Sequence, residues 1–526
     1  MENRLATAEW AHPDDVAANL PYQKGRFGLG RSLEVQGTPI GYNDDRHICL
    51  VSGTRGGKGT TTIIPNLCLW PGSAVVVDPK GENATVTAAR RGSGSEHCEG
   101  MGQTVHVLDP YRTAKVDDNL RSRFNPLDVL DRYDPHCVRN AERIAAALVP
   151  PSKAEEKFWE NGARRLIAGL VLHVLTAPEF EGRRNLVTVR ELVFRGDVAT
   201  VRLLKEQGSD NIPSGHDLLW AGMVENEAFN GYVAGVGERY RGQAINAPKQ
   251  WEGILDEAVN ATGFINNPGM AECLSASDFS LSDLKTDPDG VSLYLSIPQR
   301  FMTEDFRWLR MMIALTTTEM EAVPGLPATG HRILMCLDEF AGLKRMEVIE
   351  NAIAQMAGYG LKMFIVLQNL TQLKKHYEHS WETFLGNSGL KVFYAVDDHF
   401  TRDYVSKLVG KTERIREVES HNESVGESES QSETQTESIS RSETSSTTDN
   451  ESRSVSRSES ESHSRSHSRS QSQTRGRNFS KSRTQGHNYG QTYRSGLLFD
   501  NITSRNRGNS HSRSVTEGNS RSWTQG

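Results

Sequence analysis

The stretch HICLVSGTRGGKGTTTIIPNLCLW, His47 to Trp70, decides the fold. It opens with a short apolar run, passes through a loop with four glycines and one lysine, and ends in a run typical of a helix. A strand, a glycine-rich loop and a helix in this order can hold a phosphate group, because the loop N–H groups and the helix N-terminus face the anion. The stretch therefore predicts a strand–loop–helix unit with a phosphate site at its centre.

The loop departs at both ends from the phosphate-binding consensus G-x-x-x-x-G-K-[ST]. Ser52 stands where the consensus has its first glycine, and Gly59 stands where it has a hydroxyl residue. We predict that Lys58 contacts the β and γ phosphates and that Thr60 or Thr61 supplies the hydroxyl for a metal ion. For the loop taken alone, a glycine-rich turn with a solvated lysine stays open. The predicted binding residues are Gly53, Thr54, Arg55, Gly56, Gly57, Lys58, Gly59, Thr60 and Thr61.

Two further apolar runs end in polar side chains that suit nucleotide hydrolysis. RILMCLDEF, residues 332–340, ends in adjacent carboxylates, of which Asp338 is predicted to reach a Mg²⁺ ion and Glu339 to polarise the attacking water. MFIVLQ, residues 363–368, places Gln368 at a strand end, where an amide can bridge the γ-phosphate and the water. Each run by itself is more often structural. Together with the upstream loop they favour an ATP-hydrolysing enzyme that uses Mg²⁺.

Seven short runs rich in β-branched residues predict the sheet. Their apolar residues are continuous rather than alternating, as in strands buried on both faces of a parallel sheet. Helical runs separate them, which indicates a doubly wound, mostly parallel α/β domain. The runs are HICLV (47–51), AVVVD (74–78), VHVLD (105–109), VSLYLSI (291–297), RILMCLD (332–338), MFIVLQ (363–368) and KVFYAV (391–396).

A change of pattern within the chain predicts an insertion. Residues 135–275 carry apolar residues at helical spacing, as in NLVTVRELVF (185–194), and no strand-like run. We therefore divide the chain into a nucleotide-binding domain at 1–134 and 276–412, an inserted all-helical domain at 135–275, and a tail at 413–526.

The tail has a composition of its own. From Glu413 onward serine alternates with charged and polar residues, and large apolar residues nearly vanish, so too little surface can be buried to offset the entropy of ordering. Disorder is the first expectation. A solvated polar ribbon stays open because serines recur at every second position, as in SRSHSRSQS. The apolar island YRSGLLFDNI, Tyr493 to Ile502, is a candidate docking segment.

The charge of the tail changes from negative to positive along its length. Glutamate dominates from Glu417 to Glu451 and arginine from Arg453 to Arg521. The basic half could bind nucleic acid or the anionic face of a membrane, and a purely solvated tail is the alternative.

Composition limits the compartment and the cofactors. The net charge of −7 gives no global basic field, so contacts with nucleic acid have to be local. The six cysteines are scattered without a C-x-x-C pair, which argues against a disulfide framework or a zinc site and favours a reducing compartment. We find no apolar run of about 18 residues and no apolar signal core, so the sequence predicts a cytoplasmic protein without a spanning segment.

Several segments together resemble the type IV secretion coupling proteins of the TraG type, which are RecA-like ATPases related to the FtsK and HerA motors. The resemblance runs from about Trp10 to about Thr412, and the family's loop in one branch reads T-R-x-G-K-G, as here. It is carried by GTRGGKGTTTIIPNLCLWPGSAVVVDPKGE (53–82), VHVLDPY, FNPLDVL, LDEFAGL, AGYGLKMFIVLQNLTQLKKHY and GNSGLKVFYAVDD.

The resemblance implies a homo-hexamer that binds ATP between subunits and feeds DNA or protein into a secretion channel. The family's loop lysine matches Lys58, its acidic pair matches Asp338 and Glu339, and its strand-end glutamine matches Gln368. Its inserted helical domain, implicated in substrate recognition, matches 135–275 in position. A trans-acting arginine is expected in such hexamers; Arg345 is a candidate, and an ordinary surface arginine is an equal alternative.

These features lead to two functional hypotheses. The first is an ATP-driven hexameric coupling protein that recruits and translocates a DNA–relaxase complex to a type IV secretion or conjugation channel. The second is a receptor that recruits protein effectors with little DNA-dependent motor activity. The expected partners are channel components, relaxase or effector proteins and single-stranded DNA. Because family members typically carry N-terminal membrane helices, we expect this chain to reach the cytoplasmic face of the inner membrane peripherally or through a partner.

Overall fold

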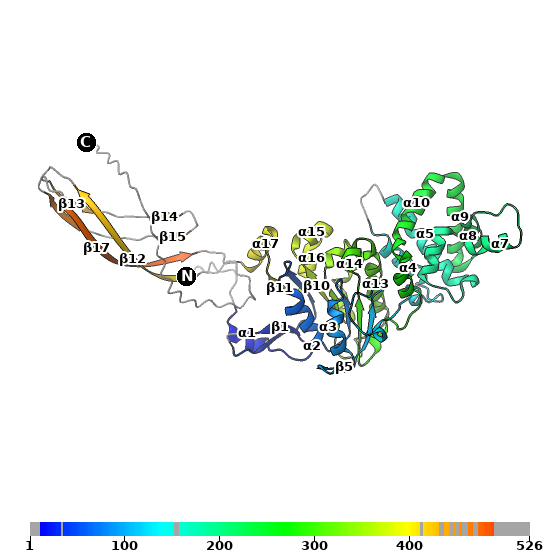
Figure 1. Cartoon of the computed structure of the whole chain (residues 1–526), viewed down its shortest axis with the longest axis horizontal. Coiled ribbons are helices and arrows are strands. Elements are labelled where there is room, and N and C mark those ends of the chain that lie inside the picture. The colour runs from blue at the N-terminus through cyan, green and yellow to red at the C-terminus, as the bar shows by residue number, and fades with distance from the viewer. Residues whose placement is uncertain are drawn as a thin grey trace.

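A seven-stranded parallel sheet forms the centre of the protein in the computed structural model (Figure 1). The structure describes residues 11–32, 35–151 and 157–410, and the tail segments 414–430, 436–441, 446–448, 452–454, 461–466 and 472–488. The strand order is β11-β3-β10-β9-β4-β8-β7. All seven predicted runs are strands of this sheet, so the predicted doubly wound parallel fold is confirmed. The strands are β3 (His47–Ser52), β4 (Ala74–Val77), β7 (Thr104–Leu108), β8 (Val291–Leu295), β9 (Ile333–Leu337), β10 (Leu361–Leu367) and β11 (Ser388–Tyr394).

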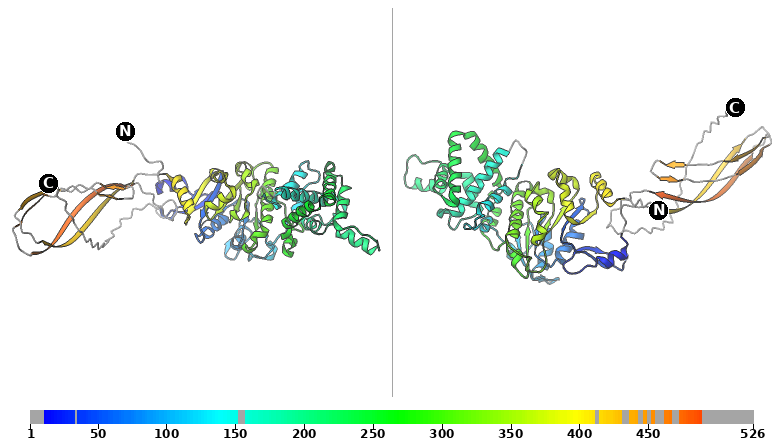
Figure 2. Two further views of the ribbon diagram at one scale, coloured as in Figure 1. Left: turned by 90° about the horizontal axis from the view of Figure 1, so that it is seen from above. Right: turned by 180° about the vertical axis from the view of Figure 1, so that it is seen from behind.

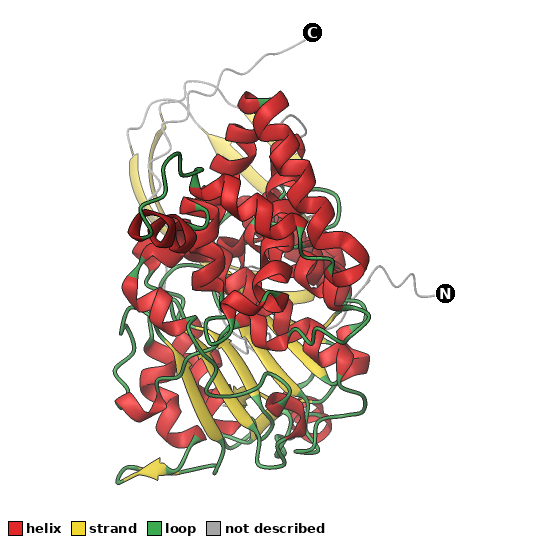
Figure 3. Cartoon of the chain, turned by 90° about the vertical axis from the view of Figure 1, so that its right-hand side faces the viewer, coloured by secondary structure: helices red, strands yellow, loops and turns green. Residues whose placement is uncertain are grey.

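Helices cover both faces of the sheet, and the strands are apolar on both sides for this reason (Figure 3). Ile48 and Leu50 of β3 join the core under α2 (Ile64–Leu69) and α3 (Glu82–Arg91), whereas Cys49 and Val51 join the core on the other side, under α13 (Met302–Ala322). Side chains of a strand alternate between faces, so continuous burial requires apolar residues at every position. The two edge strands are the exceptions: most residues of β11 are only half-buried, and in β7 Thr104 is exposed and His106 half-buried.

Between β7 and β8 the described residues form a group of helices beside the sheet (Figures 1 and 2). Aromatic rings from three of these helices fill its core: Trp251 lies 5.1 Å from Trp220 and 5.6 Å from Tyr240 between ring centroids. The domain limits given above stay a prediction. The helices are α4 (Cys137–Leu148), α5 (Lys157–Thr176), α6 (Leu186–Arg195), α7 (Val198–Glu206), α8 (Gly215–Val224), α9 (Ala228–Asn246), α10 (Pro248–Ala261), α11 (Pro268–Cys273) and α12 (Asp283–Thr286).

Smaller elements complete the part of the chain that carries the parallel sheet. A two-stranded antiparallel sheet near the start of the described chain packs Phe27 edge-on against Phe364 of β10, with 4.9 Å between ring centroids. These elements were not among the predicted runs. They are α1 (Pro13–Asn19), β1 (Phe27–Arg31), β2 (Pro39–Tyr42), the hairpin β5 (Gly94–Ser95) and β6 (Cys98–Glu99), α14 (Glu347–Ala352), α15 (Leu370–Tyr377), α16 (Trp381–Gly386) and α17 (His399–Val409).

The described tail segments are antiparallel ribbons. β12 (Arg414–Ser430) pairs with β17 (Ser472–Asn488) in a register that sets Glu427 opposite Arg475. β13 (Thr436–Arg441) pairs with β16 (Glu461–Ser466), and β14 (Ser446–Thr448) with β15 (Ser452–Ser454). The ribbon that the alternating serines allowed is therefore present in these segments, while the apolar island 493–502 lies outside the described residues. No helix in the described ranges is both long and apolar enough to cross a membrane.

Candidate functional site

The glycine-rich loop leaves the carboxyl end of β3 and enters a π-helical turn, η1 (Gly59–Ile63), which continues into α2. Gly57 has a φ of +87°, a conformation that favours glycine. At Gly53 a Cβ atom would lie 2.4 Å from the carbonyl oxygen of Ala395, so only glycine fits. The strand, the loop and the helix thus form the predicted unit, with a wider first turn than an α-helix.

Ser52 and Gly59, the two residues that depart from the consensus, lie in different surroundings. Ser52 is fully buried, and its hydroxyl has no hydrogen-bond partner among the described residues. A Cβ at Gly59 would meet nothing within 4 Å, so space does not demand glycine there. Thr54, Arg55, Thr60 and Thr61 are exposed, as expected for residues that receive a ligand.

The three sequence motifs meet at one edge of the sheet. Lys58 Nζ lies 2.8 Å from Glu339 Oε1 and 3.4 Å from Asp338 Oδ1. Gln368 Nε2 donates to Glu339 Oε2 at 2.9 Å. The strands that carry these residues are neighbours in the order β3-β10-β9, so their carboxyl ends lie together. Residues 281 positions apart along the chain, Lys58 and Glu339, are therefore in direct contact.

Backbone geometry explains how both acids reach one lysine. Consecutive residues of a strand point to opposite faces. Glu339 leaves the strand with φ 55° and ψ 40°, in the left-handed region, and begins the 3-10 turn η7 (Phe340–Leu343). This conformation costs a non-glycine residue roughly 1–3 kcal/mol, and such strain is typical of functional sites. The backbone N–H of Glu339 also donates to Asp338 Oδ1 at 3.0 Å.

The charged side chains at this edge of the sheet shift one another's pKa values. Burial raises the pKa of Asp338, and the Glu339 carboxylate raises it further, while Lys58 acts in the opposite sense. Burial lowers the pKa of Lys58, but the two carboxylates outweigh burial and leave that pKa above its ordinary value. Lys58 therefore stays cationic. Burial likewise raises the pKa of Asp78 at the end of β4 to about 6, although the N–H of Ala84 stabilises its charged form at 2.9 Å.

The hydroxyl groups that follow Lys58 are ordered by a residue that the sequence analysis missed. Thr60 Oγ1 donates to the Gly57 carbonyl at 3.2 Å, and Thr61 Oγ1 donates to the same carbonyl at 2.9 Å. The phenol oxygen of Tyr394 lies 3.1 Å from the hydroxyls of both Thr61 and Thr62. Its sequence signal was its place at the end of the run KVFYAV, at the carboxyl edge of the sheet.

The donors at this edge fit a metal–nucleotide complex. Mg²⁺ takes oxygen ligands, and in nucleotide sites it is held by one or two carboxylates, a hydroxyl and the phosphates rather than by a full protein cage. Asp338 and the exposed Thr60 supply groups of these two kinds. The loop offers backbone N–H groups and the Lys58 ammonium, which are groups that suit phosphate oxygens.

A buried arginine ties the turn after Glu339 to the helical group. Arg310 of α13 donates through Nη1 to the carbonyls of Leu343 at 2.8 Å and Arg345 at 2.6 Å. Its Nε donates to the carbonyl of Ala147, near the end of α4, at 3.3 Å. Burial lowers the pKa of Arg310 to about 10, so the side chain is charged at neutral pH.

The structure gives the candidate Arg345 a partner within the chain. Its Nε lies 3.2 Å from Glu350 Oε2, and half of its side chain is exposed. The contact is compatible with an ordinary surface arginine, and a role across a subunit interface stays a prediction.

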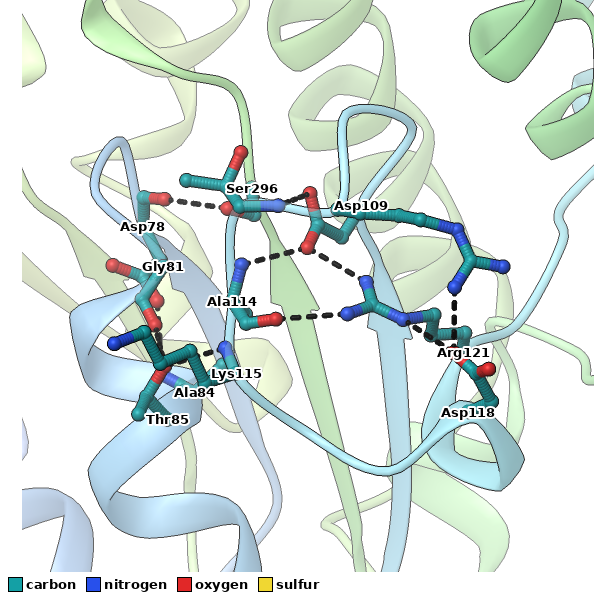
Figure 4. Close-up of polar contacts among 12 residues, drawn as sticks. Asp78, Gly81, Ala84, Thr85, Asp109, Ala114, Lys115, Asp118, Arg121 and Ser296 are labelled. Carbon is teal, nitrogen blue, oxygen red and sulfur yellow. Dashed lines mark hydrogen bonds and ion pairs between the residues drawn. The ribbon is translucent and has the colours of Figure 1, made fainter.

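The DPKGE segment and the loop after β7 form a second polar group (Figure 4). The carboxylate of Asp109 accepts from the N–H groups of Thr113 and Ala114, each at 2.8 Å, and from Arg121 Nη1 at 2.8 Å. Gly81, with a φ of +64°, lies so close to this loop that a Cβ would come within 2.6 Å of Ala114 N. These contacts shape two neighbouring loops at the carboxyl edge.

Known proteins match most of this chain. The family model described as Type IV secretory system Conjugative DNA transfer matches residues 9–445. Conjugal transfer protein TraG of Escherichia coli is 28% identical over 393 residues, covering 72% of this chain and 57% of that protein. Protein VirD4 of Agrobacterium fabrum is 28% identical over 386 residues, covering 71% of this chain and 51% of that protein. The chain thus spans just over half the length of these curated relatives.

Solved structures share the fold. The bacterial conjugative coupling protein TrwBdeltaN70, in a trigonal form with sulphate, matches with a TM-score of 0.56 and 16% identity over 79% of this chain and 85% of that chain. Plasmid coupling protein TrwB in complex with the non-hydrolysable ATP analogue ADPNP matches with a TM-score of 0.53 and 16% identity over 78% and 85%. With the match of the family model over residues 9–445, this chain belongs to the Type IV secretory system Conjugative DNA transfer family, the type IV coupling proteins.

Proposed function

We propose that this chain hydrolyses ATP and uses the energy to deliver substrate to a type IV secretion channel. The observation that carries the proposal is the contact of Lys58 with Glu339 and of Glu339 with Gln368, at 2.8 Å and 2.9 Å, beside a glycine-rich loop. Membership of the coupling-protein family supports it, and so does the ATP analogue named for TrwB, which has the same fold.

The chain's own residues divide the work in this proposal. The ammonium of Lys58 leaves Glu339 for the β and γ phosphates, which frees the Glu339 carboxylate to hold and polarise the attacking water. Gln368 senses this movement of Lys58 away from Glu339 because its amide is hydrogen-bonded to the same carboxylate. Asp338 and Thr60 would hold a Mg²⁺ ion, which would neutralise charge on the phosphates when bound.

The assembly and the cargo are further parts of the proposal. We expect a homo-hexamer at the cytoplasmic face of the inner membrane, with ATP between subunits, channel components as partners, and a DNA–relaxase complex as substrate. The second candidate function is the recruitment of effector proteins by the helical group, which displays the apolar side chains of Phe194, Leu203 and Ile245 at 55%, 52% and 72% exposure.

The test is ATP turnover by the full chain, with and without single-stranded DNA. Lys58→Ala is expected to abolish nucleotide binding, and Glu339→Gln to bind ATP without turnover. Lys205→Ala and Glu206→Gln change the same residue types at exposed positions on α7 and serve as matched controls. Full turnover in Glu339→Gln would contradict the role of that carboxylate.

The same assay separates the two candidate functions. A DNA motor is expected to show turnover stimulated by single-stranded DNA and strongly salt-dependent DNA binding, because neutralised phosphates release counterions. An ATP turnover rate that is the same with and without DNA would favour the second hypothesis, a receptor for protein effectors.

A further inference from the structure

The carboxyl end of the edge strand β11 makes hydrogen bonds at two points of the glycine-rich phosphate loop, residues 53–61, and the helical turn behind it. The Tyr394 hydroxyl lies 3.1 Å from Thr61 Oγ1 and 3.1 Å from Thr62 Oγ1. The next residue, Ala395, accepts a hydrogen bond from the N–H of Gly53 at 3.1 Å, with its own φ at +49°. One short segment thus contacts both the first glycine of the loop and the first helical turn behind it.

The directions of these hydrogen bonds follow from the chemistry of hydroxyl groups. A hydroxyl has one proton to donate, whereas a carbonyl can only accept. Thr61 gives its proton to the Gly57 carbonyl at 2.9 Å, so it accepts from Tyr394. Tyr394 has then given away its only proton and accepts from the buried Thr62. The result is a directed chain from Thr62 through Tyr394 and Thr61 to the Gly57 carbonyl.

Thr60 stands outside this chain. Its hydroxyl makes one hydrogen bond, at 3.2 Å to the Gly57 carbonyl that Thr61 already engages at 2.9 Å, and the residue is exposed. Its hydroxyl can turn toward a ligand at little cost, whereas that of Thr61 would have to break three contacts, with the Gly57 carbonyl, Tyr394 and Thr62.

The π-helical turn explains why the hydroxyl comes one residue later than in the consensus. The N–H of Ile64 donates to the carbonyl of Gly59, five residues back, so the turn holds one residue more than an α-helical turn. Turns of this kind are frequent at functional sites. Gly59 takes the consensus position, and the wider turn accommodates the displaced Thr60.

We propose that Tyr394 is a positioning residue of the phosphate site, which locks Thr61 and Thr62 against the loop and leaves Thr60 as the hydroxyl that serves a metal–nucleoside triphosphate. The inference deepens the proposed function and rests on it. Tyr394 itself contacts threonines of the loop and the helix, so its effect on a ligand is exerted through them.

The test is the dissociation constant of a fluorescent ATP analogue, measured by anisotropy on the full chain with Mg²⁺ and with EDTA. Tyr394→Phe removes one oxygen and with it the hydrogen bonds to Thr61 and Thr62, and is expected to weaken binding about 5- to 30-fold under both conditions. Thr61→Val removes the contact with Tyr394 together with the hydrogen bond to the Gly57 carbonyl, so it is expected to weaken binding at least as much. The double variant is expected to lose less than the sum of the two single losses, because both single variants remove the contact between Thr61 and Tyr394. Tyr359→Phe, at an exposed tyrosine, is the matched control.

Thr60→Val has a different signature. It is expected to remove most of the gain in affinity that Mg²⁺ gives over EDTA, while binding in EDTA stays at the wild-type value. Thr61→Ser keeps the hydroxyl and is expected to keep the affinity, which separates a lost hydrogen bond from a folding defect.

Each result decides something. Wild-type affinity in Tyr394→Phe, with ATP binding intact in the parent chain, overturns the role of Tyr394 and leaves the proposed function standing. Loss of the Mg²⁺ effect in Thr61→Val rather than Thr60→Val overturns the assignment of the hydroxyl. A parent chain that binds no nucleotide overturns the proposed function, and the inference falls with it.

Discussion

Replacing Gly53 by alanine tests the contact between the phosphate loop and β11. The added Cβ would lie 2.4 Å from the carbonyl oxygen of Ala395, a backbone atom, where ordinary contact begins at 3.4 Å. The loop and the strand end must therefore separate by about 1 Å, which also stretches the Gly53 N–H to Ala395 hydrogen bond of 3.1 Å. Gly53 does not have a positive φ, so the effect is steric rather than conformational.

The magnitude follows from that overlap. Forcing an extra carbon into a packed position costs about 1–3 kcal/mol. If the loop yields, a free energy of that size lowers nucleotide affinity by about 5- to 150-fold. Gly235→Ala in α9 is the matched control away from the loop, because its Cβ meets nothing within 4 Å and its φ is not positive. In a helical turn that exchange is expected to stabilise the chain by about 0.5–1 kcal/mol.

The assay is isothermal titration of each variant with a non-hydrolysable ATP analogue, together with its melting temperature. We expect Gly53→Ala to lose affinity, melting temperature or both, and Gly235→Ala to lose neither. Equal affinity and equal melting temperature in the two variants would refute the steric reasoning and the close approach of Ala395 to the loop.

Two further predictions concern buried charges. Asp78 has a folded-state pKa of about 6, above its unfolded value, so its burial favours the protonated form, and the free energy of unfolding falls by roughly 3 kcal/mol in all as pH rises from about 4 to about 6. The free energies of unfolding of the wild type and Asp78→Asn, measured in urea across this range, should converge at low pH and diverge above it. Parallel pH curves would count against the shift. Arg310→Met leaves three carbonyls without their charged donor, at about 1–3 kcal/mol each. We expect a lower melting temperature, faster amide hydrogen exchange in η7 and slower ATP turnover, and we expect Arg310→Lys to recover only part of each loss. An unchanged exchange rate in η7 would refute the link between Arg310 and this turn.

The sequence was enough to predict the seven strands of the sheet. Runs such as AVVV (74–77) and MFIVL (363–367) are apolar at every position, as strands covered on both faces require. The motif residues Lys58, Glu339 and Gln368 were also predictable as neighbours, because the carboxyl ends of parallel strands share one edge. The roles assigned to them stay predictions.

Other features depend on contacts that no local pattern encodes. Tyr394 meets Thr61 across 333 positions of the chain, and this contact depends on β11 being the strand next to β3. The left-handed Glu339 follows from its surroundings and not from its own preference, since glutamate rarely adopts it. The short strands β1 and β2 were missed because they hold too few apolar residues to stand out from turns.

The strand order has a consequence for how such proteins can diversify. The helical group enters from β7 and returns through β8, and three strands separate β8 from β3. At about 4.8 Å per step, β8 lies about 19 Å from the strand that feeds the phosphate loop. Mutations can therefore accumulate in the helices while the cluster of Lys58, Glu339 and Gln368 keeps its geometry. Arg310 is the short bridge between the two, so exchanging whole helical groups between relatives should succeed best where the Ala147 backbone is retained at the junction.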